Sequence, residues 1–257
     1  MQLRKKSHKK IPCYVLIFDQ IEIIQKTLDF LVQYSNKLDL FIIENPSDNT
    51  PEIKQIVDTH GKAGLIRRHY LFNKNITSTA FELVINNDLA KLQKSPYVLI
   101  TDGDLVAEQK TWLDEEITIL EQNPSVFACG VSLDMSNLPV VAFPDATSWV
   151  PSDRAIYPTF FEAVTGGHLL LFRGREFSQF MLWKNKHGLN FVDGVMHRYC
   201  YEELHKKWAR TKDAKAYHLT WDLYANIDHP YTNLKTKKNF QDTWYHSQKA
   251  GYILTEY

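Results

Sequence analysis

The sequence has few cysteines, no excess charge of either sign and no long apolar run, and each absence excludes a class of protein. Cys13, Cys129 and Cys200 are far apart and odd in number, so they indicate neither a disulfide framework nor a zinc cluster. Lys plus Arg and Asp plus Glu both total 30, which leaves no global positive field for a nucleic acid. No uncharged apolar stretch is long enough to span a membrane. We therefore expect a soluble protein of the reducing cytoplasm with no nucleic-acid partner.

The composition that remains is that of a folded globular protein. Hydrophobic residues make up 44% of the chain and charged residues 23%, close to globular averages, which argues against wholesale disorder. The 257 residues are enough for one sizeable core and correspond to one or two domains.

A basic arm precedes the first apolar run. Residues 1–10 hold five lysines or arginines, without the apolar core or small-residue cleavage site of a signal peptide. We expect this arm to be disordered. It is either a solvated tail or a segment that contacts anionic lipid, which would place the protein at the inner face of a membrane as a peripheral protein.

Apolar periodicity predicts an alternation of strands and helices over the first half of the chain. Continuous apolar, β-branched runs indicate buried strands, and apolar residues at three- and four-residue spacing indicate amphipathic helices. The expected strands are 13–18, 40–43, 65–66, 97–100 and 126–131, and the expected helices are 22–32, 50–61, 80–92 and 112–120. This order predicts an α/β fold, a Rossmann-like doubly wound and mostly parallel sheet with helices on both faces.

Acidic loops follow three of these strands. Asp19 comes after the first strand, Glu44 and Asp48 after the second, and Asp102 and Asp104 after the fourth. Ligands of such sheets bind beyond the carboxyl ends of the strands, so these carboxylates are expected to lie together at a binding site.

The sequence Asp102-Gly103-Asp104 suits a divalent cation. Two carboxylates that face one point repel each other, and Mg²⁺ or Mn²⁺ relieves this while leaving positions for water and a diphosphate. The same three residue types also favour an ordinary turn. Their place after an apolar strand, at the edge where ligands bind, favours the metal site.

Residues 132–161 are too long for an ordinary connection. They are rich in Pro, Ser and Asp, with Trp149 and Tyr157 among them. The segment is either a binding loop or lid, or an excursion that packs locally.

Several motifs together resemble the inverting family 2 glycosyltransferases, which have the GT-A fold. They are F-I-I-E-N-P-S-D-N-T at 41–50, Asn73 in F-N-K-N, V-L-I-T-D-G-D-L at 98–105 and T-G-G-H-L-L-L-F-R-G-R-E-F at 165–177. The resemblance covers most of residues 11–222. It implies a catalytic domain with a nucleotide-sugar-binding half, 11–131, and an acceptor-binding half, 132–222, followed by an aromatic and basic extension, 223–257.

The resemblance also implies roles in the first half. Glu44 would accept hydrogen bonds from the nucleotide base, with Asp19, Asp48 and Asn73 as further donor-binding residues. Asp102 would contact the ribose, and together with Asp104 it would hold a Mn²⁺ or Mg²⁺ ion against the diphosphate. The family has an aspartate where this chain has Glu44.

In the second half, the resemblance implies that Gly166 and Gly167 let the backbone approach the sugar or acceptor. At the family's intervals after this motif, Asp193 would be the general base, and His218 would complete the metal or phosphate site as a metal ligand or a phosphate-binding residue. The family's usual acidic pair is Val192-Asp193 here.

The implied activity is metal-dependent transfer of a sugar from a nucleotide-sugar, expected to be a UDP-sugar, to a hydroxyl of a glycan or lipid-linked acceptor. Inversion at the anomeric carbon is expected, in the synthesis of a surface polysaccharide or lipopolysaccharide. A retaining GT-A enzyme and a non-catalytic nucleotide- or carbohydrate-binding module are alternatives. A nucleotidyltransferase is disfavoured because residues 13–25 contain neither the glycine nor the arginine of a phosphate loop.

Overall fold

A computed structural model describes residues 9–150, 152–236 and 250–257. Residues 1–8 of the expected basic arm lie outside this range, as do Trp244 and Tyr245 of the C-terminal extension. Among the helices that are described, none has the length and apolarity to cross a bilayer.

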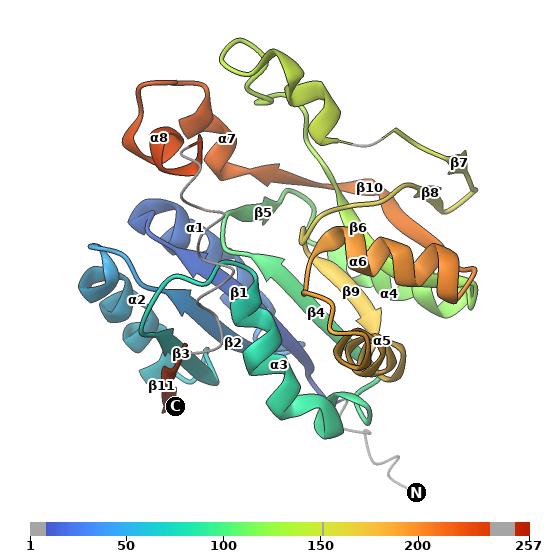
Figure 1. Cartoon of the computed structure of the whole chain (residues 1–257), viewed down its shortest axis with the longest axis horizontal. Helices are drawn as coiled ribbons and strands as arrows, with labels where there is room; N and C mark the ends of the chain where they lie inside the picture. Colours follow the sequence, from blue (N-terminus) through green and yellow to red (C-terminus); the bar gives the residue numbers. More distant parts are fainter. Residues whose placement is uncertain (1–8, 151, 237–249) are drawn as a thin grey trace, which may run out of the picture.

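The first half of the chain alternates strands and helices, and the second half adds both parallel and antiparallel strands to the same sheet (Figure 1). The first-half elements are β1 (Ile11–Phe18), α1 (Ile21–Leu31), β2 (Leu38–Asn45), α2 (Thr50–Lys62), β3 (Arg68–Phe72), α3 (Thr79–Leu92), β4 (Tyr97–Asp102), β5 (Leu105–Ala107), α4 (Trp112–Gln122) and β6 (Val126–Leu133). The second-half elements are β7 (Ala155–Ile156), β8 (Phe160–Glu162), β9 (Leu170–Arg173), α5 (Gly174–Lys186), α6 (Asp193–Arg198), β10 (Lys207–His218), α7 (Leu219–Tyr224), α8 (Pro230–Thr236) and β11 (Tyr252–Glu256).

All described strands belong to one sheet, in the order β11-β3-β2-β1-β4-β9-β6-β10-β8-β7, with β5 paired to β10. β3, β2, β1 and β4 are parallel neighbours. β9 is antiparallel to both β4 and β6, and β10 is parallel to β6, so β6 and β10 run in the same direction as β1. The predicted α/β fold with a mostly parallel sheet is confirmed.

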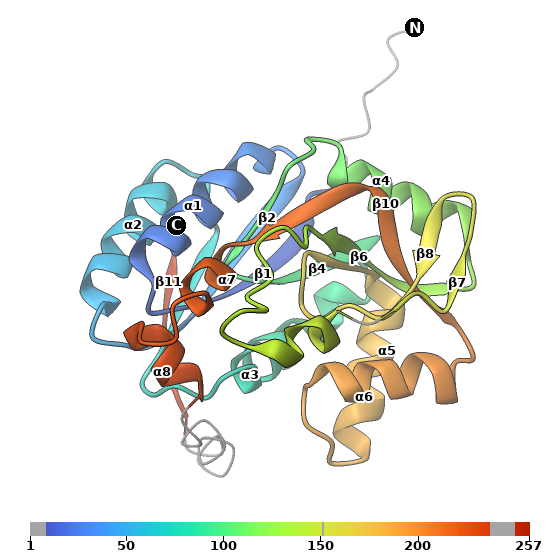
Figure 2. The ribbon, with the colours of Figure 1, turned by 90° about the horizontal axis from the view of Figure 1, so that it is seen from above.

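Helices cover both faces of the sheet (Figure 2). α1, α2 and α4 pack on one face against a core that includes Val15, Leu40 and Leu99. α3, α5 and α6 pack on the other face around Phe127 and Phe172. Each central strand is therefore buried on both sides, which is why its sequence is a continuous apolar run.

The prediction of a third strand at 65–66 is wrong. Leu65 and Ile66 lie in the connection after α2, and the strand is Arg68–Phe72. Its sequence, R-H-Y-L-F, hides the strand because His69 is polar yet only 1% exposed, where it pairs with a glutamate of β2. A strand that contains a buried polar residue is therefore not detected from its apolar pattern.

The long segment 132–161 contains regular structure. After β6 it forms a short 3-10 turn at Pro144–Trp149 and then the β7–β8 hairpin, whose second strand pairs with β10. The chain beyond β10 passes through α7 and α8, and β11 then adds to the far edge of the sheet beside β3.

Candidate functional site

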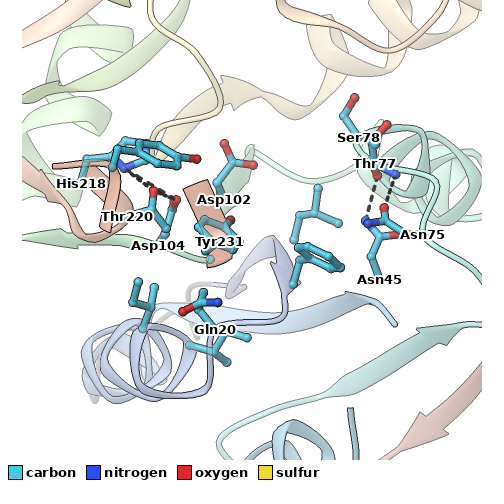
Figure 3. A pocket seen from close by; sticks show the side chains of 16 residues that line it. Gln20, Asn45, Asn75, Thr77, Ser78, Asp102, Asp104, His218, Thr220 and Tyr231 are labelled. Carbon is cyan, nitrogen blue, oxygen red and sulfur yellow. Dashed lines mark hydrogen bonds and ion pairs between the residues drawn. The ribbon is translucent and has the colours of Figure 1, made fainter. Parts of the chain in front are cut away.

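A cavity of about 470 Å³ lies at the carboxyl ends of β1, β2 and β4. Sixteen residues line it, and eight of their polar side chains form two groups toward its opposite ends (Figure 3). We call Asp102, Asp104, His218 and Thr220 the charged end, and Asn45, Asn75, Thr77 and Ser78 the neutral end. The volume lies within the range of ordinary small-ligand sites, roughly 300–1,000 Å³.

The charged end is assembled by pairing between distant segments. β5 follows Asp104 directly and is antiparallel to β10, with Leu105 opposite His218. The Leu219 N–H donates to the backbone oxygen of Asp104 at 2.8 Å. As a result, His218 Nδ1 lies 3.6 Å from Asp104 Oδ2, and both side chains are largely buried.

The donor set of the charged end fits a hard divalent cation. Asp102, Asp104 and His218 all face the cavity, and carboxylate oxygens with an imidazole suit Mn²⁺ or Mg²⁺. Among the described residues, no three His, Cys, Asp or Glu side chains are close enough to hold a metal unaided. Such ions commonly take their remaining ligands from water and substrate phosphates. These residues would therefore hold a metal together with a bound diphosphate.

Gly103 is required by the fold. A Cβ on Gly103 would lie 2.6 Å from Ile17 Cγ2 and 2.8 Å from the Leu16 carbonyl oxygen. The Gly103 N–H also donates to that oxygen at 2.7 Å. The group that approaches this glycine closely is the chain's own β1, so only glycine fits between the two aspartates.

Gly166 and Gly167 lie between Asp102 and Asp193. The Asp102 N–H donates to the Gly167 oxygen at 2.9 Å, and a Cβ on Gly167 would lie 3.4 Å from Asp102 Oδ2. A Cβ on Gly166 would lie 3.2 Å from Asp193 Oδ2. The loop that contains the two glycines therefore lies against Asp102 of the charged end on one side and against the candidate base, Asp193, on the other.

Asp193 is the first residue of α6. Desolvation by surrounding protein atoms raises the pKa of its carboxyl group to about 6, although the residue keeps access to solvent. A carboxylate with a pKa near neutrality is a better proton acceptor than an ordinary aspartate and is still ionised at pH 7.

His168 lies between these two parts of the site. Its ring stands edge-on to His218, with the centroids 5.5 Å apart. Burial and the neighbouring His218 lower the pKa of His168 to about 3, so the ring is neutral at physiological pH. The next residue, Leu169, has a φ of 46°, an uncommon conformation for a branched side chain.

The neutral end is built from the loops after β2 and β3. The Asn45 side chain donates to the Thr77 oxygen at 3.1 Å and accepts from the Ile76 N–H at 3.1 Å. Asn75 Oδ1 accepts from the Thr77 N–H at 2.9 Å. Thr77 has a φ of 52°, which is strained for a β-branched residue and is maintained by these bonds.

Two of the predicted donor-binding residues from the first half, Glu44 and Asn73, do not line this cavity. Glu44 is completely buried, and its Oε2 lies 2.8 Å from His69 Nε2, so it does not reach the cavity. Asn73 is exposed and exchanges hydrogen bonds with Gly251 beside β11. In each case a neighbouring asparagine faces the cavity instead: Asn45 follows Glu44, and Asn75 lies two residues beyond Asn73.

The other two predicted donor residues lie next to the site and do not line the cavity. Asp48 is exposed in the turn before α2. Asp19, at a φ of 66°, receives hydrogen bonds from Asn49 at 3.3 Å and Gln20 at 2.6 Å, and Gln20 lines the cavity.

The C-terminal extension also contributes to the site, which sequence reasoning missed. Tyr224 and Tyr231 line the cavity, with their rings stacked 6.0 Å apart. Tyr224 also contacts Phe143 and Trp149 from the long segment. The sequence Y-A-N-I-D-H-P-Y at 224–231 contains both aromatic residues, but their spacing does not indicate which part of the protein they contact.

No family model matches the chain. Among curated proteins, the uncharacterized protein L142 of Acanthamoeba polyphaga mimivirus is 42% identical over 241 residues, which cover 91% of this chain and 49% of that protein. The uncharacterized protein L137 of the same virus is 41% identical, over 96% of this chain and 34% of that protein. The chain thus spans half or less of the length of these relatives.

Two solved structures resemble the fold. A mannosyltransferase from Pyrobaculum calidifontis, in complex with GDP-Man and Mn²⁺, matches 93% of this chain and 68% of its own, with a TM-score of 0.51 and 15% identity. GalNAc-T7 with UDP, GalNAc and Mn²⁺ matches 83% of this chain and 44% of its own, with a TM-score of 0.52 and 8% identity. These similarities confirm the predicted GT-A fold.

Proposed function

We propose that this chain, which has the GT-A fold, is a metal-dependent glycosyltransferase that uses a nucleoside diphosphate-sugar. The observation that carries the proposal is the convergence of Asp102, Asp104 and His218 on one end of a cavity. Asp193 lies on the other side of the loop that contains Gly166 and Gly167. The two structural neighbours were solved with a nucleoside diphosphate or its sugar conjugate and Mn²⁺. This shared chemistry supports the same donor class for this chain.

The donor would lie along the cavity. Its base and ribose would meet the amide and hydroxyl groups of the neutral end, and its diphosphate would lie beside the charged end. Asp102, Asp104 and His218 would hold a Mn²⁺ or Mg²⁺ ion there. When bound, that ion supplies positive charge against the negative charge that develops on the leaving diphosphate.

Asp193 would act on the acceptor. As the acceptor oxygen attacks the anomeric carbon, the Asp193 carboxylate takes the proton from the hydroxyl group, and the bond between the sugar and the diphosphate breaks. Attack from the face opposite the leaving group inverts the anomeric configuration. A retaining reaction needs no such base, so the place of Asp193 beside Gly166 favours inversion over the retaining alternative.

A UDP-sugar donor and a glycan or lipid-linked acceptor, in surface-glycan or lipopolysaccharide synthesis, are the finer parts of the proposal. The expected membrane contact of the basic arm bears on the acceptor. An arm that contacts anionic lipid would bring the protein to a membrane surface, where a lipid-linked acceptor would be within reach.

The proposal is tested with a panel of UDP- and GDP-sugars, by measuring released nucleoside diphosphate with Mn²⁺ or with a chelator. We expect release from one donor that depends on the metal. Asp104→Asn should reduce that release about 10² to 10³-fold, since it removes one charge from the metal site. Asp213→Asn is the matched control, because Asp213 is exposed on β10 away from the cavity.

The same panel separates the alternatives. Donor binding by calorimetry without any release would identify a non-catalytic binding module and contradict the proposal. Nucleoside triphosphates are added to the panel for the third alternative, and release of pyrophosphate from one of them would indicate a nucleotidyltransferase. The anomeric configuration of the product, read by NMR, would distinguish inversion from retention.

A further inference from the structure

One hydroxyl group joins the two kinds of side chain in the charged end. Thr220 Oγ1 lies 2.7 Å from Asp104 Oδ2 and 3.0 Å from His218 Nδ1. Thr220 is itself only 2% exposed, and it lines the cavity (Figure 3). The carboxylate, hydroxyl and imidazole form a continuous chain of hydrogen bonds.

The direction of these bonds follows from charge. An ionised carboxylate can only accept hydrogen bonds, and a hydroxyl group has a single proton to donate. At 2.7 Å, two acceptor oxygens would repel each other, so the Thr220 proton points to Asp104. The Thr220 oxygen is then an acceptor toward His218, and Nδ1 of the imidazole must carry a proton.

Packing keeps the imidazole ring in this orientation. The indole of Trp221 stacks on His218 with a centroid separation of 4.7 Å and an angle of 3°. The ring of His168 meets it at 82°. The backbone bond from Leu219 to Asp104 fixes the spacing between the two strand ends. These contacts fix the plane of the ring, and within that plane only the present orientation places Nδ1 beside Thr220.

We propose that Thr220 is a positioning residue that holds His218 in the tautomer protonated at Nδ1, which leaves Nε2 with the lone pair. Only an unprotonated nitrogen can bind a metal, so the hydroxyl group prepares Nε2 for that role while it restrains the Asp104 carboxylate. The metal part of this inference rests on the proposed function. The tautomer part rests on the three side chains alone.

The first test needs no variant. NMR of metal-free protein with ¹⁵N-labelled histidine, at pH 8, distinguishes the two neutral tautomers and the doubly protonated ring by their nitrogen shifts. The chain has ten histidines, so His218→Gln identifies the signal of His218 by its loss. We expect a proton on Nδ1 only. A ring protonated at Nε2 alone or at both nitrogens would overturn the inference.

The second test changes the hydroxyl group. Thr220→Val keeps the shape and removes the hydroxyl, so the His218 signal should move toward a mixture of tautomers. Mn²⁺ affinity in the presence of UDP, measured by calorimetry, should fall about 10 to 100-fold. Thr220→Ser keeps the hydroxyl and should restore both readouts. Thr118→Val, on the exposed side of α4, is the control and should alter neither.

The outcomes separate this inference from the proposed function. An unchanged tautomer and an unchanged Mn²⁺ affinity in Thr220→Val would refute the role of Thr220 even in an active transferase. A shifted tautomer and weakened Mn²⁺ binding, in a protein that releases no nucleoside diphosphate from any sugar, would support Thr220 and refute the transferase. If Thr220→Val does not fold, the wild-type spectrum and Thr220→Ser still decide the tautomer.

Discussion

The two ends of the cavity use different chemistry and are built in different ways. The neutral end comes from loops after β2 and β3, which are neighbours in the sheet and close in sequence. The charged end joins Asp102 and Asp104, at the end of β4, to His218 and Thr220, at the end of β10, across more than a hundred residues. Amides and hydroxyls discriminate by hydrogen-bond pattern, whereas carboxylates and an imidazole bind charge. The cavity thus suits a ligand with a neutral polar part and a phosphate part.

The two ends also differ in how their buried polar groups are hydrogen-bonded. At the neutral end, the asparagine amides are already bonded to the backbone of residues 75–77, which rigidifies the loop. At the charged end, polar side chains from separate elements bond to one another. Losing one group at the neutral end should weaken recognition, whereas losing one at the charged end should stop the chemistry.

The largest effect is expected from Asp193→Asn, which tests whether α6 supplies the general base in addition to the two ends of the cavity. The amide cannot take the acceptor proton, so transfer should fall about 10³-fold, within the range of general-base contributions. Donor and Mn²⁺ binding by calorimetry should stay unchanged. Near-normal turnover in this variant would remove Asp193 from the mechanism.

Glu44→Ala tests whether the buried carboxylate belongs to the fold or to the neutral end. It leaves His69 buried without its partner, so we expect a loss of about 3 kcal/mol in the free energy of unfolding, measured by urea denaturation. The donor KM of the folded variant should match that of the wild type. A raised donor KM at unchanged stability would restore Glu44 to the nucleotide site.

The pH profile of transfer distinguishes a base from a metal ligand. Because the pKa of Asp193 is raised to about 6, the carboxylate loses its proton above that pH and is protonated below it. We expect turnover to fall as pH decreases through 6, by about tenfold for each further unit. The Asp193→Asn variant should lack this limb, and a limb that persists in it belongs to another group.

Asn75→Ala should raise the donor KM about tenfold, the value of one lost hydrogen bond to a buried ligand. Asn73→Ala is its matched control: the same substitution two residues away, outside the cavity. The donor KM is measured for both variants from turnover, and the Kd of the nucleoside diphosphate is measured by calorimetry. An effect of Asn73 equal to that of Asn75 would place the donor elsewhere.

The smallest effect is expected from Asp48→Asn. The side chain is exposed and does not line the cavity, so the donor KM should change less than about twofold. A tenfold increase would show that the loop before α2 closes over the donor.

The sequence predicted the parallel part of the fold because β1, β2 and β4 are apolar on both faces. Asp102, Asp104 and His218 were identified as neighbours, and they share the cavity. What pattern alone could not predict was which of two adjacent polar residues faces the ligand. Glu44 and Asn45 are consecutive in β2, so their side chains point to opposite faces of the sheet. Glu44 meets the buried His69, and Asn45 faces the cavity.

Contacts across long stretches of sequence account for the rest. Thr220 resembles any helix-start threonine until β5 pairs with β10 and places Asp104 beside it. Tyr224 and Tyr231 follow the last predicted element, and the return of β11 to the opposite edge of the sheet left no periodic signal.

The pairing of β5 with β10 also determines when a growing chain becomes able to act. Asp104 and Thr220 are 116 residues apart, so at roughly 10 residues per second the ribosome delivers the second on the order of ten seconds after the first. The loops of the neutral end emerge well before that. A nascent chain therefore contains the residues of the neutral end before it contains those that complete the charged end.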